Sequence, residues 1–203
     1  MIESIERQPR IEILPAFNID RRLRLKETDL NGIARMVGDL LPQCLNDNVE
    51  VTVTLLEKNL MTMADVVLMK EALTYLIKNA MNVMPNGGKL SLSTSQVNFE
   101  IESLLHRDNY MLGACAFISL ADTGADIDER IKEKMFEPFF IPITGNFKGL
   151  DLLIAYRITK QHHGYIKIKN QGGQETELNI YLPLTVQEIM KMLSIPVGAS
   201  HGR

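Results

Sequence analysis

An uninterrupted apolar run over residues 111–121 restricts the fold of this chain more than any other feature of its sequence. A strand with one face in water alternates apolar and polar residues, whereas a continuous run suits a strand that is covered on both faces. The run therefore predicts a central strand of a sheet. Asp122-Thr123-Gly124 follows it directly and predicts a turn at the end of that strand.

Regular patterns elsewhere supply neighbours for this strand. Apolar residues recur at helical spacing from Thr28 to Pro42 and from about Asp65 to Met84. Further strands are predicted at 49–55, 89–94, 166–168 and 178–182, and further helices at 128–135, 150–164 and 186–193. These elements predict an α+β fold, a two-layer α/β sandwich in which helices cover one face of a mixed sheet.

The length of the chain bounds its domain organisation. Its 203 residues suffice for one sizeable domain, which we place at residues 28–184. Residues 1–27 show no sustained periodicity and are expected to form a linker or the end of a preceding element. Residues 185–203 are expected to form a short helix and a tail.

Charge and cysteine content exclude several classes of protein. The net charge of -3 gives no electrostatic reason to expect a nucleic-acid or membrane surface. Cys44 and Cys115 are too few for a disulfide framework or a zinc site. No apolar run approaches the ~20 residues that cross a bilayer, and the amino terminus has no signal-peptide core. We therefore expect a cytoplasmic chain with no nucleic-acid binding and no direct membrane contact.

Five short motifs occur in a characteristic order. They are Leu76 to Ala80, Met84 to Gly88, Asp122 to Asp126, Phe136 to Phe140 and Lys148 to Leu152. In this order they resemble the ATP-binding domain of sensor histidine kinases, in the superfamily that also contains gyrase and the heat-shock chaperone ATPases. The resemblance covers about residues 28–184 and implies a domain that binds ATP together with Mg²⁺.

The resemblance implies roles for five residues. Asp122 takes the position of the aspartate that accepts a hydrogen bond from the adenine amino group, and Gly124 the position where the backbone passes close to the base. Asn79 takes the position of the asparagine that coordinates magnesium, and its amide oxygen is a suitable hard ligand. Lys148 and Gly149 lie where the family binds the phosphates.

Several residues depart from the family pattern. Tyr75 stands where the family carries asparagine and related ATPases carry the glutamate that activates water. Because a phenol is a poor base near neutral pH, gyrase-type hydrolysis is not expected. At the phosphate end the usual glycine or polar residues are replaced by Asp126, Ile141-Pro142-Ile143, Phe147 and Asp151. A carboxylate in the first turn of a helix repels the phosphate that this helix end would otherwise attract.

The histidines leave two functions open. A sensor kinase phosphorylates a histidine on a helical hairpin before the ATP domain, but residues 1–105 contain no histidine, and His162 and His163 are expected to be structural. The first reading is a catalytic domain that donates the γ-phosphate to a histidine on another domain, with a histidine-bearing dimerisation domain and a response-regulator receiver domain as partners. The second is a non-catalytic, pseudokinase-type module for docking or dimerisation. Whether the chain is an enzyme stays open between them.

Overall fold

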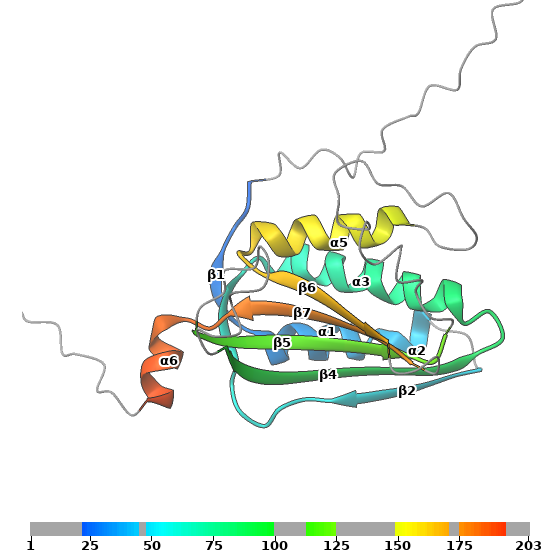
Figure 1. Ribbon diagram of the computed structural model, residues 1–203, viewed down its shortest axis with the longest axis horizontal. Helices are drawn as coiled ribbons and strands as arrows, with labels where there is room; N and C mark the ends of the chain where they lie inside the picture. Colours follow the sequence, from blue (N-terminus) through cyan, green and yellow to red (C-terminus); the bar gives the residue numbers. More distant parts are fainter. Residues whose placement is uncertain (1–21, 45–47, 100–112, 125–148, 171–174, 194–203) are drawn as a thin grey trace, which may run out of the picture.

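A five-stranded mixed sheet forms one layer of the protein, as seen in a computed structural model that describes residues 22–44, 48–99, 113–124, 149–170 and 175–193 (Figure 1). The strand order is β2 (Val49–Thr54), β4 (Gly88–Phe99), β5 (Gly113–Asp122), β7 (Thr176–Pro183) and β6 (Tyr165–Asn170). β2 runs parallel to β4, and the other pairs are antiparallel. The apolar run thus forms the middle strand, as predicted.

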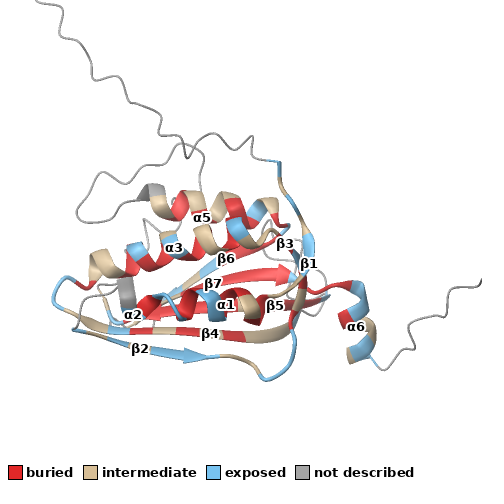
Figure 2. Cartoon of the chain, turned by 180° about the vertical axis from the view of Figure 1, so that it is seen from behind, coloured by how far each residue is buried: buried red, intermediate tan, exposed pale blue. Residues whose placement is uncertain are grey.

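Three helices form the second layer, on one face of this sheet (Figure 1). They are α1 (Leu30–Gly38), α3 (Val66–Val83) and α5 (Gly149–Gln161). The core between the layers contains alternate strand residues and the inner stripes of the helices, including Leu90, Leu92, Ile118, Leu120, Leu178, Ile180, Ile33, Met69, Leu73 and Leu76. All of these residues are buried, and Figure 2 shows buried segments in red along the strands and helices of the two layers. The predicted two-layer α+β sandwich is confirmed.

Two short strands were not anticipated from the sequence. β1 (Lys26–Asp29) pairs antiparallel with β3 (Met61–Ala64) at one end of the main sheet. Asp29 fixes this junction, since its Oδ1 accepts hydrogen bonds from the backbone amides of Asn31 at 3.1 Å and Leu60 at 3.0 Å. The same side chain caps α1, which ends at Gly38 rather than continuing to Pro42. Four-residue strands are too short to show a reliable period.

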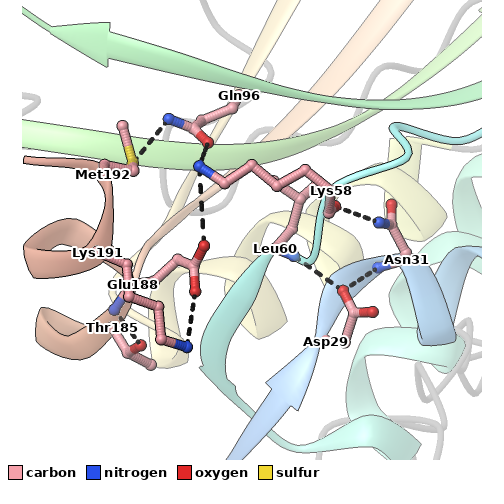
Figure 3. Close-up of polar contacts among 9 residues, drawn as sticks. All are labelled: Asp29, Asn31, Lys58, Leu60, Gln96, Thr185, Glu188, Lys191 and Met192. Atoms are coloured by element: carbon pink, nitrogen blue, oxygen red, sulfur yellow. Dashed lines mark hydrogen bonds and ion pairs between the residues drawn. The ribbon is translucent and has the colours of Figure 1, made fainter. Parts of the chain in front are cut away.

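A buried asparagine holds the connection between β2 and β3. Asn31 is 4% exposed, and its Nδ2 donates to the carbonyl oxygens of Leu56 at 2.9 Å and Lys58 at 2.8 Å. Its Oδ1 accepts the Thr94 hydroxyl at 2.6 Å, while Thr94 accepts the amide of Leu56. Figure 3 shows Asn31 between Asp29 and Lys58. Both the oxygen and the nitrogen of the Asn31 side-chain amide therefore have structural partners.

The last helix, α6 (Val186–Met192), is fastened to the domain by one buried acid. Glu188 is 3% exposed and lies 3.8 Å from Lys58 Nζ and 3.5 Å from Lys191 Nζ (Figure 3). The Thr185 hydroxyl caps the helix by accepting the Glu188 amide. Within the described ranges no helix has the length and apolar character to cross a membrane.

A buried histidine joins the end of α5 to the start of α3. His162 Nε2 accepts the backbone amide of Asp65 at 3.0 Å, and Nδ1 lies 2.7 Å from the carbonyl oxygen of Ile158. These two bonds require the neutral tautomer with its proton on Nδ1. Burial lowers the pKa of His162, although the backbone bond to Ile158 and the negative charge of Asp65 raise it. The structural role expected for His162 is confirmed.

We predict that this link makes the domain less stable in mild acid. The unfolded chain takes up a proton near pH ~6.5, whereas folded His162 does so only at lower pH, so its contribution is complete above pH ~6.5 and is lost as the pH falls below that value. Urea unfolding at pH 7.5 and 5.5 should show this loss. His162→Gln should reduce the pH dependence and cost ~1–2 kcal/mol at pH 7.5.

Exposed His163 offers the matched control, because His163→Gln removes a neighbouring imidazole that carries no buried bond of this kind. The same pH dependence in His162→Gln as in the wild type would show that His162 is not its source.

Candidate functional site

The described members of the predicted site lie on α3, at the end of β5 and at the start of α5. Asn79 lies on α3, Asp122 is the last residue of β5, and Gly149 opens α5. α3 and α5 pack against each other, and α3 also packs on β5. Lys148 lies outside the described residues, as do the replacements at Asp126, 141–143 and Phe147 and the motif at 136–140.

One face of α3 forms a wall of the site. Asp65 starts this helix by accepting the amides of Val67 and Leu68 on its Oδ1. Tyr75, Asn79 and Val83 are spaced four residues apart, so they follow one another along a single side of the helix. The wall therefore carries a phenol, an amide and an apolar side chain in sequence.

Asn79 in the middle of this wall has an unused oxygen. The residue is 3% exposed, and its Oδ1 has no hydrogen-bond partner among the described residues. A buried acceptor without a partner costs ~1–3 kcal/mol. An oxygen kept in this state is suited to a ligand that supplies a cation or a donor.

Asp122 and Thr176 form the polar floor at the end of the sheet. They are register partners of β5 and β7, and both are at least 98% buried. Asp122 Oδ1 accepts the amide of Gly124 at 2.9 Å, whereas Thr176 Oγ1 has no partner within the described ranges. Sequence reasoning missed Thr176. Its position, two residues before Leu178 and four before Ile180, is the signal, because it puts a hydroxyl on the apolar side of β7.

Gly124 allows the backbone that follows β5 to pass close to α3. A Cβ atom at this position would lie 2.4 Å from Val83 Cγ2 and 2.8 Å from Asp122 Oδ1. Both distances are too short for non-bonded atoms. The glycine thus keeps the floor and the wall of the site in contact.

The opposite end of the wall is acidic. The Tyr75 hydroxyl donates to Glu71 Oε1 at 3.5 Å, and Asp151 lies in the first turn of α5. Burial raises the pKa of Tyr75, and the negative charges of Glu71 and Asp151 raise it further. The Lys78 ammonium lies 5.6 Å from the centre of the Tyr75 ring. Because its phenol stays protonated, Tyr75 does not act as a base here.

A groove opens beside this acidic end. It has a volume of about 470 Å³, and its lining includes Leu40, Lys70, Thr74, Lys78, Asn82 and Asp151. The apolar part of the lining comes from the end of α1 and its neighbours and from Ile77 and Met81 of α3, and the polar part from α3 and α5. The groove thus brings Asp151 to the same surface as two lysines of α3.

This combination of fold and site is that of a family of ATPases. Residues 64–186 match the model of the Histidine kinase-, DNA gyrase B-, and HSP90-like ATPase family, and the chain belongs to that family. The matched segment runs from the start of α3 to the start of α6 and so includes Asn79, Asp122, Gly124 and Thr176. A nucleotide is the ligand that this family implies.

Within the family the similar proteins are sensor kinases. The chain is 28% identical over 176 residues to sensor kinase CckA of Brucella abortus, covering 86% of this chain and 19% of that protein. It is 25% identical over 181 residues to sporulation kinase D of Bacillus subtilis, covering 86% of this chain and 32% of that protein. It therefore spans a fifth to a third of their length, and that part is the histidine kinase ATPase-like catalytic domain.

Solved structures agree with this placement. The nucleotide-free catalytic domain of histidine kinase ThkA matches with a TM-score of 0.62 and 25% identity, covering 80% of this chain and 99% of that one. Full-length ShkA in complex with AMPPNP matches with a TM-score of 0.60 and 21% identity, covering 80% of this chain and 32% of that one. The second likeness supports the fold alone.

We predict that replacing Gly124 and Gly32 by alanine changes the stability of the domain in opposite directions. Gly124→Ala should destabilise the domain by ~1–3 kcal/mol, because α3 or the end of β5 must shift. Gly32→Ala in α1 meets nothing within 4 Å and should stabilise it by ~0.5–1 kcal/mol. Urea unfolding measures both changes. Equal stability of Gly124→Ala and the wild type would contradict the close contact with Val83.

Proposed function

We propose that this domain binds Mg-ATP between α3, the end of β5 and the first turn of α5, and donates the γ-phosphate to a histidine on another domain. The observation that carries this proposal is that two buried oxygens, Asn79 Oδ1 on α3 and Thr176 Oγ1 opposite Asp122 on β7, have no hydrogen-bond partner among the described residues. A third such atom, Asn179 Oδ1, belongs to a residue of β7 that is not part of the proposed site. Each such oxygen costs stability in the free protein, and a ligand that reaches the first two can supply the missing partner.

The adenine end of the proposed site lies at the sheet. The Asp122 carboxylate can accept an N–H of the adenine amino group, and the Thr176 hydroxyl can donate to a ring nitrogen or accept from that amino group. Both side chains are buried, so these hydrogen bonds would form away from water, where they are strong. This arrangement supports selectivity for adenine.

The phosphate end lies along α3 toward α5. Asn79 offers the hard oxygen that Mg²⁺ prefers, and the metal, when bound, would neutralise charge on the phosphates. The first turn of α5, which Gly149 opens, has backbone amides without an acceptor inside the helix, where an anion is favoured, and Lys148 is proposed as an additional phosphate contact. The chain's own part is thus to bind and orient the nucleotide.

The acceptor histidine is proposed to belong to a separate domain. His162 uses both ring nitrogens in structural contacts and is 2% exposed, so it is a poor acceptor. The curated relatives are three to five times longer than the segment matched here. We therefore propose a histidine-bearing dimerisation domain and a receiver domain as partners, in the cytoplasm.

A second function is favoured by one observation. Tyr75, Glu71 and Asp151 place a phenol and two carboxylates where the resemblance implies the phosphate end. The negative charge of the two carboxylates repels a bound triphosphate. A domain that does not turn ATP over would act as a docking or dimerising module.

Titration calorimetry with ATP and ADP, with Mg²⁺ and with EDTA, tests the proposed site. Asp122→Asn should weaken binding ~10–100-fold under both conditions, because one hydrogen bond to a charged acceptor is lost. Asn79→Ala should remove only the Mg²⁺-dependent part of the affinity. Asn98→Ala, at an exposed position of β4, is the matched control and should bind as the wild type does. No heat at millimolar nucleotide would favour the docking module.

A further inference from the structure

The proposed site has an adenine end and an acidic end, which are separated along α3. Val83 packs beside Gly124 and Asp122 at the adenine end, and Tyr75 lies two turns earlier on the same side of the helix, at the acidic end. Eight residues of α-helix correspond to ~12 Å. Asn79 lies midway, and its Oδ1 has no hydrogen-bond partner in the part of the chain that the structure describes. A nucleotide anchored at Asp122 therefore extends its phosphate chain past Asn79 toward Tyr75.

Asp151 stands at the far end of this path. The Asp151 charge acts on the Tyr75 hydroxyl, and its side chain shares the groove with Thr74 and Lys78. It occupies the first turn of α5, where a carboxylate interacts favourably with the free amides of the helix end. A phosphate oxygen at this helix end therefore competes with the Asp151 carboxylate.

The repulsion depends on the length of the phosphate chain. Each additional phosphate brings about one more negative charge closer to Asp151 and Glu71, and repulsion between like charges rises as their separation falls. Lys70 and Lys78 line the same groove as Asp151 and offset part of this repulsion. A diphosphate ends nearer Asn79, where this repulsion is weaker.

We propose that Asp151 is a specificity-determining residue, which makes this site select adenosine diphosphate over adenosine triphosphate. The proposal rests on the nucleotide site proposed above. It adds the residue whose charge distinguishes ATP, the substrate, from ADP, the product. Asp151 acts through its charge, so an uncharged residue of the same shape removes the selectivity and a longer acid keeps it.

The test compares ATP, ADP and adenosine on the whole chain by titration calorimetry, in low salt, with Mg²⁺ and with EDTA. The wild type binds ADP more tightly than ATP. Asp151→Asn raises the affinity for ATP about tenfold, that for ADP less and that for adenosine not at all, as expected for a screened charge at several ångströms. Asp151→Glu keeps the wild-type order. Glu27→Gln removes an equal charge on exposed β1 and changes none of the affinities.

Three results separate the possible failures. An unchanged ratio of ATP to ADP affinity in Asp151→Asn overturns the role of Asp151 while leaving the nucleotide site intact. An equal gain for adenosine, ADP and ATP also overturns it, because a gain for adenosine reflects packing and not charge. Absence of nucleotide binding in both the wild type and Asp151→Asn overturns the proposed site itself. Thermal unfolding of each variant verifies that the fold is retained.

Discussion

The packing of α3 on the central strand fixes the geometry on which the rest of the protein depends. β5 is hydrogen-bonded to a neighbour on each side, so its position leaves little freedom, and α3 buries its apolar stripe against the core that β5 forms. Once that stripe is buried, the helical period determines which residues are left at the flank. Tyr75, Asn79 and Val83 therefore face the start of α5 and the end of β5 as a consequence of hydrophobic burial elsewhere on the helix.

A binding site made in this way carries a cost in the free protein. Among the described residues Asn79 Oδ1 and Thr176 Oγ1 have no hydrogen-bond partner, whereas the similarly buried Asn31 makes three hydrogen bonds through the oxygen and nitrogen of its side-chain amide. This contrast indicates a structural role for Asn31 and a ligand-binding role for Asn79. Both are small polar residues in a helix, and only the surrounding groups distinguish them.

Much of the fold followed from periodicity, because long elements repeat their pattern often enough to be recognised. The apolar run that became β5 and the stripe of α3 were predicted in this way. β1 and β3 were missed because four residues carry too little pattern, and their pairing depends on the distant contact between Asp29 and Leu60. In the site, Asn79, Asp122 and Gly124 came from motif order, and the structure places Asp122 and Gly124 beside Val83, one turn along α3 from Asn79. The spacing of Thr176 from Leu178 and Ile180 puts it on the apolar side of β7, but its pairing with Asp122 depends on strand register, which a single sequence does not reveal. The roles of these residues, and of Lys148 and Gly149, remain predictions.

The bond between His162 and Asp65 has a mechanical meaning for the site. It ties the end of α5 to the start of α3, at the end of α5 remote from Asp151. Eleven residues of helix separate His162 from Asp151, about 16 Å, so a rotation of α5 by about 5° about His162 would displace its first turn by about 1.4 Å. The position of Asp151 is therefore sensitive to a bond that lies far from any nucleotide.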